Sequence, residues 1–444
     1  MNVEVRSVQT AAEQAAGEQF KAVADRLPGA AAARSAAIQR FGASGLPHRR
    51  IEDWKYTDLR SALRELPAPA KASDAPIGPE TLGDIDAWRI VVVDGGAPRL
   101  PEGLSAQGVT ATSLADVLAG DADGSAAAGV LDGWPAESQS AVLDLNTAFM
   151  TSGVVVRVPD GIHLDRPIHI ATVTTVPEAA SVYLRNGIEV GAGAAATVIE
   201  TYEGPDGIGY VVNTAARISV GRDGALSWIK VQREGDAAFH LATVSADIAQ
   251  GARMTCAPFT TGAALSRNQI AINFGGTHAE ANVAGVQLLG GRQHGDTTLF
   301  VDHALPDGDS RELFKTVLDD RARGVFQGKI VVRQDAQKVD GKMMTQSLML
   351  SEQAEVDAKP ELEIYADDVQ CGHGSTSGRI DEDLLFYLRA RGIPEVQAKA
   401  LLIEAFVGEA VEAIGDETIG EALSGLVHEW VVRHAGQDDG EADR

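Results

Sequence analysis

From residue 152 onward, short β-type runs recur at a spacing that suits a stacked repeat. Ile188, Ile218 and Ile248 stand 30 residues apart, and each is followed three residues later by a glycine. Each glycine precedes another strand-like run. An apolar strand, a glycine turn and a second apolar strand make up the unit of a stacked solenoid. The spacing therefore favours a β-helix, while three copies leave a β-sandwich open as the alternative.

Alternation of side chains is clear inside one of these runs. In residues 226–232 (LSWIKVQ), Leu226 and Trp228 share one face of an extended segment, with Lys230 as a candidate third member.

Helical patterns flank the β-type region on both sides. Residues 8–42 show the apolar spacing of a helix, and the Pro/Ala-rich residues 67–80 indicate a linker. Near the C-terminus, Asp381 is placed to cap one helix and Pro394 to begin the next.

The predicted protein is mainly β. We expect a mostly helical N-terminal domain over 1–150, a parallel β-helix core over 151–370, and a C-terminal helical domain with a disordered tail over 371–444.

Charge and cysteine content exclude several classes of protein. The chain of 444 residues has a formal net charge of −25, which argues against nucleic acid and anionic membranes as partners. Its two cysteines exclude a disulfide framework and a self-sufficient four-cysteine cluster. We find no secretory signal and no apolar run near the roughly 18 residues of a membrane span, so we expect the cytoplasm.

Motifs of self-contained enzymes are missing. The stretch at 324–330 (GVFQGKI) has neither the spacing nor the final Ser/Thr of a Walker A loop, which argues against an ATPase. Gly191 and Gly193 lack the third glycine of a dinucleotide fingerprint. The chain therefore shows none of these enzyme motifs, and we assign no catalytic residues from them.

Cys371 and His373 have the spacing that most suggests metal chemistry. In an extended segment, positions i and i+2 project to the same side, so a thiolate and an imidazole would lie together. That pair suits iron, zinc or the edge of a cluster. Two ligands complete neither a tetrahedral site nor a four-ligand cluster, so a partner subunit is the natural source of the others. A packed thiol beside a hydrogen-bonded turn histidine remains open as the alternative.

A long collinear series of motifs occupies residues 317–406. It runs through FQGK at 326–329, DAQK at 335–338, LMLS at 348–351, AEVDAKP at 354–360, LEIYADDV at 362–369, CGHGST at 371–376 and LLFYLRARGI at 384–393. This series closely resembles the SufB/SufD family of the SUF iron–sulfur cluster assembly machinery. The resemblance covers the last third of the chain strongly, and the region from about residue 140 more loosely.

The resemblance implies a right-handed parallel β-helix between two helical domains, and a non-catalytic scaffold subunit that supports iron entry. It implies pairing with SufB through the β-helix, and a transient iron or iron–sulfur cluster shared with SufB at Cys371 and His373. It also implies docking of the SufC ATPase on the C-terminal helices. The residues we expect at that docking surface are Asp381, Leu384, Phe386, Tyr387, Arg389, Arg391, Leu401 and Phe406. A flavin has been associated with such complexes, but this chain shows no flavin motif, and whether the isolated chain forms a homodimer stays open.

Two features resemble the SufD branch of the family more than the SufB branch. One is WKYT at 54–57, and the other is Gly374, where SufB-type members usually carry an acidic residue. Gly372 and Ser375 depart from the SufD-type motif C-S-H-G-A-T only by exchanges of small residues. The competing hypotheses are a SufB-like main scaffold, a β-helix carbohydrate-active enzyme with paired carboxylates, and a solenoid without a metal role.

Overall fold

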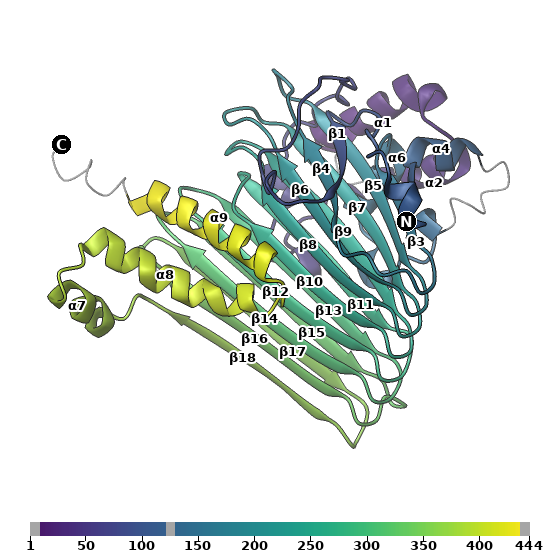
Figure 1. Ribbon diagram of the computed structural model, residues 1–444. Coiled ribbons are helices and arrows are strands. Elements are labelled where there is room, and N and C mark those ends of the chain that lie inside the picture. The colour runs from purple at the N-terminus through teal and green to yellow at the C-terminus, as the bar shows by residue number, and fades with distance from the viewer. Residues whose placement is uncertain (1–8, 121–128, 436–444) are drawn as a thin grey trace, which may run out of the picture.

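Figure 1 shows the computed structural model of the chain, which describes residues 9–120 and 129–435. A long β-region occupies the centre, with one group of helices near the first strands and another beside the later strands. The tail from residue 436, for which we expected disorder, lies outside the described residues.

The N-terminal region is helical, but the single helical segment expected over residues 8–42 is divided. Thr10 caps α1 (Ala11–Val23), as its position in the sequence suggests. The chain then breaks at Gly29, whose φ of +45° suits glycine, before α2 (Ala31–Ser44) begins. The other short elements are η1 (Ala24–Arg26), η2 (Glu52–Trp54), α3 (Leu59–Ala62), η3 (Leu104–Gln107), α4 (Leu114–Gly120), η4 (Ala136–Ser138) and α6 (Ala141–Phe149).

The centre of the molecule is a parallel β-helix made of two sheets, each with nine strands among the described residues. One sheet is called the even sheet here, because all of its strands except the first have even numbers. It contains, in order, β1 (Trp88–Val93), β4 (Ile168–Val173), β6 (Ala195–Glu203), β8 (Ala225–Arg233), β10 (Arg253–Thr260), β12 (Glu280–Leu289), β14 (Asp309–Leu318), β16 (Asp340–Met349) and β18 (Gln370–Gly378). The odd sheet contains β17 (Glu355–Ile364), β15 (Arg323–Val332), β13 (His294–His303), β11 (Leu265–Phe274), β9 (Phe239–Ile248), β7 (Val211–Val220), β5 (Ser181–Val190), β3 (Val154–Val158) and β2 (Thr110–Ser113). The chain alternates between the two sheets, which confirms the predicted parallel β-helix.

The 30-residue period holds for the step from β5 to β7, but other steps differ in length. Ile188 lies opposite Ile218, as the period predicts. Ile248 instead lies opposite Val220, and the partner of Ile218 is Ala246. The third isoleucine of the repeat is therefore displaced by two residues from the strand partner that the period predicts. A shift of two positions keeps the same side chains pointing inward, so the apolar pattern tolerates it.

The interior between the two sheets is mainly apolar and takes one face of every strand. Leu226 and Trp228 belong to this core, and both are buried. Lys230 shares their face and is also buried, with 2% of its surface exposed. The predicted face is correct for all three residues, so β8 carries an ammonium group into the core.

Three helices follow the last strand, namely α7 (Glu382–Ala390), α8 (Glu395–Glu412) and α9 (Glu417–Ala435). Asp381 caps α7 and Pro394 precedes α8, as predicted. Helices α8 and α9 pack on the outer face of the even sheet through an apolar cluster, whereas α7 lies beyond the strands (Figure 1). Within the described ranges, we find no helix with the length and apolar character that crossing a membrane requires.

Candidate metal and partner site

Cys371 and His373 lie on β18, the last strand of the even sheet, where the backbone is extended as the prediction required. In the parallel register, Cys371 lies opposite Gly341 and His373 lies opposite Met343. Met343 points into the core, so both candidate ligands project from the interior face of the sheet. The structure therefore brings the predicted thiol and imidazole to one face at the open end of the β-helix.

The surroundings of Cys371 keep its thiol protonated. Burial raises the pKa of Cys371, and the charges of Asp340 and Glu312 act in the same direction, against an opposing backbone hydrogen bond at Gly341. Because Gly341 has no side chain, a gap lies beneath the sulfur. A Cβ built at residue 341 would lie 3.6 Å from Cys371 Sγ and 3.4 Å from Ser310 Oγ. A bound cation would be needed to lower this pKa and favour the thiolate.

Glu312 is a buried carboxyl group near this site that sequence reasoning missed. It lies on the interior face of β14, opposite Met343, and is 2% exposed. Neither of its carboxyl oxygens has a well-aligned hydrogen-bond partner within the described part of the chain, although the nearby Ser310 side chain acts to lower its pKa. Burial raises the pKa of Glu312 to about 8, so the group is largely neutral at pH 7. Alternation with Phe314, two residues later on the same face, was the signal that could have placed it inside.

The candidate ligands do not form a complete metal site on their own. Among the residues that the structure describes, no three His, Cys, Asp or Glu side chains are close enough together to hold a metal ion. His373 is exposed, and Cys371 is half-buried. Any cation at this pair would therefore need ligands from another molecule.

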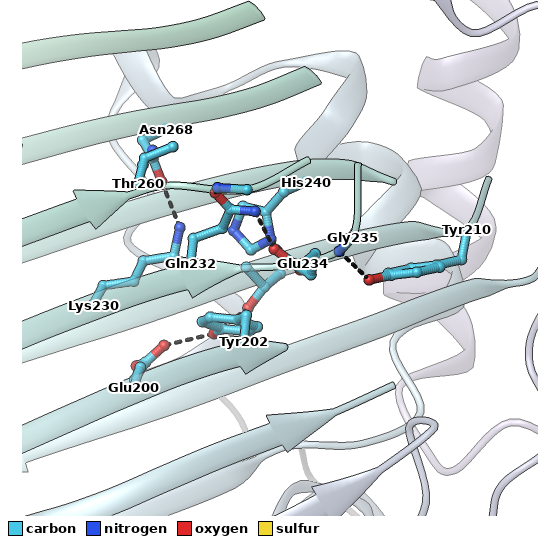
Figure 2. Close-up of polar contacts among 12 residues, drawn as sticks. Glu200, Tyr202, Tyr210, Lys230, Gln232, Glu234, Gly235, His240, Thr260 and Asn268 are labelled. Atoms are coloured by element: carbon cyan, nitrogen blue, oxygen red, sulfur yellow. Dashed lines mark hydrogen bonds and ion pairs between the residues drawn. The ribbon is translucent and has the colours of Figure 1, made fainter. Parts of the chain in front are cut away.

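A second polar group of side chains lies deep in the core, between β6, β8, β9 and β11 (Figure 2). Glu200 accepts hydrogen bonds from Tyr202 Oη at 2.6 Å and from Trp228 Nε1 at 3.1 Å. Lys230 donates to Asn268. Burial lowers the pKa of Lys230 to about 8, although Glu234 and Glu200 act to raise it.

The same network continues from Glu234 toward the turn between β8 and β9. Glu234 Oε1 lies 2.7 Å from His240 Nδ1, and Glu234 also accepts a hydrogen bond from Gln232. Burial lowers the pKa of His240, so its ring is neutral at pH 7. At the turn, Tyr210 Oη accepts the backbone N–H of Gly235 at 2.9 Å (Figure 2). These contacts satisfy the buried carboxylates and hold the turns in register.

Cys256 lies on the core face of β10, in the apolar interior near Lys230. Burial raises the pKa of Cys256 to about 12. A thiol with this pKa stays protonated at neutral pH and acts as a small packed side chain. This agrees with the interpretation of Cys256 from sequence as packing rather than as a ligand.

The C-terminal helices expose a cluster of large apolar side chains. The exposed fractions are 52% for Leu384, 74% for Phe386, 55% for Tyr387 and 46% for Leu401. Phe406 differs, because it packs against the sheet with Lys315 Nζ 4.6 Å from its ring centre. The structure thus leaves these four expected docking residues exposed, whereas Phe406, also expected at the docking surface, is partly buried against the sheet.

The charged residues of the expected docking surface form a cap, a hydrogen bond and an ion pair in α7 and the turn after it. Asp381 Oδ1 accepts the backbone N–H groups of Asp383 and Leu384. Arg391 donates to Tyr387 Oη at 2.9 Å, and Arg389 pairs with Glu395 at 3.0 Å. These contacts keep α7 ordered although none of its residues is buried.

Comparison with known proteins identifies the family to which this β-helix with flanking helices belongs. The family model of the SUF system FeS cluster assembly SufBD core domain matches residues 172–406, and the model of the SufBD protein N-terminal region matches residues 21–170. The chain belongs to the SufB/SufD family. The core-domain match includes β18 and continues into α8, so both candidate surfaces lie within the SufBD core domain.

Individual relatives cover most of the chain. The iron–sulfur cluster assembly protein SufD of Escherichia coli is 31% identical over 392 residues, which is 87% of this chain and 89% of that protein. A SufBD family protein of Synechocystis is 32% identical over 411 residues, covering 86% of each chain. A SufBD family protein of Mycobacterium tuberculosis is 28% identical over 394 residues, covering 86% of this chain and 88% of that protein. Residues 21–406 of this chain therefore match both regions that the SufBD family models describe.

Proposed function

We propose that this chain is a SufD-type scaffold subunit of a SufBCD complex, without catalytic turnover of its own and with the cytoplasm as its compartment. It would pair with SufB through the open end of the β-helix and dock the SufC ATPase on its C-terminal helices. Cys371 and His373 would supply part of a shared site for incoming iron or a nascent cluster. The observation that carries this proposal is the position of this pair on the last, uncovered strand.

The open end of the β-helix supports pairing with a second β-helix. Strands β17 and β18 each have one strand neighbour in the described residues, and neither contains a buried residue. Parallel strands are usually covered on both faces, and unpaired strand edges recruit further strands. A partner strand placed here would lie directly against Cys371 and His373.

The exposed apolar cluster of α7 and α8 supports docking of a second protein. Leu384, Phe386 and Tyr387 lie on a helix with no buried residue, and their apolar side chains are exposed among the residues that the structure describes. Exposed aromatic side chains on a charged rim are typical of the centre of a protein interface.

Reconstitution with the SufB and SufC partners tests the metal role. We expect Cys371→Ser and His373→Ala complexes to assemble normally and to hold at least about fivefold less iron and sulfide, because each loses one of two ligands. His278→Ala is the matched control, since His278 is an exposed histidine on a turn of the β-helix. A His373→Ala complex that builds clusters at the wild-type rate would remove the proposed role of that residue.

A further inference from the structure

The WKYT loop at 54–57 is held against the outer face of the odd sheet by a buried ion pair. The Arg267 guanidinium lies 3.9 Å from the centre of the Trp54 ring and pairs with Asp296, and both charged side chains are buried. The Thr57 hydroxyl donates a hydrogen bond to the same carboxylate. Arg267 also donates to the carbonyl of Asp53 at 2.6 Å. These contacts fix the position of the loop through Trp54 and Thr57. The motif therefore has a structural role, and the Lys55 and Tyr56 side chains take no part in these contacts.

A pocket of about 420 Å³ lies between this loop and the first residues of four neighbouring strands. Phe239, Leu265, His294 and Arg323 begin β9, β11, β13 and β15, and they lie side by side in register. Tyr56 lines the pocket from the loop. The volume suits a small organic molecule, and Phe239, Leu265 and Tyr56 offer it an apolar surface.

Basic side chains outnumber acidic ones in the lining of this pocket, although the whole chain is acidic. Arg49, Lys55 and Arg323 line it together with Asp58, and Arg323 is paired with Asp357 and Glu355. Arg49 is largely exposed and lies 4.0 Å from Asp58, at the limit of an ion pair. Within the described residues Lys55 forms no ion pair, and its Nζ lies 5.4 Å from the centre of the Tyr56 ring. An anionic ligand would thus meet Lys55, whose charge also acts on Glu52, and the weakly paired Arg49, in a chain with a net charge of −25.

We propose that this pocket binds a small organic phosphate, with the phosphate at Arg49 and Lys55 and an apolar body against Phe239 and Tyr56. Guanidinium and ammonium groups bind phosphate through charge-assisted hydrogen bonds, and an aromatic side chain offers a flat surface for stacking. The net charge of the chain disfavours a long polyanion, so the ligand is a small molecule. The site lies on the odd sheet, whereas Cys371 lies on the even sheet, so the inference is independent of the proposed metal role.

Calorimetric titration of the full chain in phosphate-free buffer at low salt tests the inference. Three probes are used. Inorganic pyrophosphate presents the anion alone, adenosine presents the apolar body alone, and adenosine diphosphate presents the two together. We expect adenosine diphosphate to bind most tightly, pyrophosphate more weakly, and adenosine not measurably. Failure of both phosphate probes to bind with a saturable 1:1 isotherm would overturn the inference.

Charge variants give changes of opposite sign that a purely structural role would not produce. We expect Lys55→Ala and Arg49→Ala each to weaken binding of adenosine diphosphate about tenfold, since each removes a charge-assisted contact. Asp58→Asn should tighten it, because it removes the acidic partner of Arg49 while asparagine can still cap α3. Lys71→Ala, an exposed lysine outside the pocket, is the control and should leave binding unchanged. Equal affinity in all four variants would contradict the proposed site, as would weaker binding by Asp58→Asn.

Discussion

Strands β7 and β18 have the same parallel pairing but very different burial. In β7, eight of ten residues are buried, because neighbouring turns and helices cover it on both sides. In β18, none of the nine residues is buried. A central turn has a neighbouring turn on both sides, whereas within the described residues the last turn has a neighbour on one side only. This difference in burial is the basis for the proposal that the last turn meets another protein.

Buried polar groups differ between the same two regions. In the central turns, the carboxylates of Glu200 and Glu234 accept hydrogen bonds from neighbouring strands. Near the last turn, Glu312 is equally buried but has no partner for either oxygen in the described part of the chain. Native proteins rarely leave such groups unpaired without a functional reason. The hydrogen bonds of Glu200 and Glu234 therefore contribute to the central fold, whereas Glu312 makes no such contribution.

The largest expected effect comes from creating a cavity in the central core. Trp228→Ala removes a fully buried side chain and the indole donor to Glu200. We expect the free energy of unfolding to fall by about 3–5 kcal/mol, as for other large-to-small core substitutions, measured by chemical denaturation. A loss below about 1 kcal/mol would show that the central turns are less tightly packed than the comparison requires.

Glu312→Gln should change how stability depends on pH. The folded pKa of about 8 lies above the ordinary value of 4.5, so the folded state holds this proton more tightly than the unfolded state. As pH rises from 4.5 to 8, the unfolded carboxyl ionises first, and the wild type loses stability by at most about 1.4 kcal/mol per pH unit. Glutamine does not titrate, so the free energy of unfolding of the variant, relative to that of the wild type, should rise progressively over this pH range. Parallel stability curves for the two proteins would contradict the position of Glu312 as an unpaired buried acid.

Phe386→Ala separates partner binding from folding. The side chain is 74% exposed, so the free energy of unfolding should change by less than about 0.5 kcal/mol. If α7 is a docking surface, affinity for the ATPase partner should fall about thirtyfold, the typical loss at an aromatic hot spot. Leu100→Ala, which also truncates an exposed apolar side chain, is the control. Wild-type ATPase affinity in Phe386→Ala would place the docking surface elsewhere.

The smallest expected effect is that of His373→Ala on stability. His373 is exposed on the outermost strand, so its removal should change the unfolding free energy by less than about 0.5 kcal/mol. Thermal unfolding of the isolated chain measures this directly. A large loss would show that His373 has a structural role in the last turn, and the comparison with the central turns would then weaken.

Local patterns predicted much of the fold, because they depend on residues near one another in sequence. Alternation placed Leu226 and Trp228 in the core, and the polar residue before α7 was correctly identified as its cap. The i, i+2 spacing of Cys371 and His373 correctly predicted a shared face once the segment was extended. The misaligned repeat at Ile248 shows the limit, because turn lengths vary and a shift of two residues leaves the inward pattern unchanged.

The sequence by itself favoured a stacked β-repeat and determined the helical ends and the SufBD motifs, since periodicity, caps and motifs are local properties of a chain. Only the tertiary structure decided which polar groups pair inside the core, and that Glu312 remains unpaired near the last turn. It also decided that the WKYT loop lies across strands more than 200 residues away, where Arg267 and Asp296 hold it. Hydrogen bonds and charge depend on distances between segments remote in sequence, and stacking of the turns sets those distances.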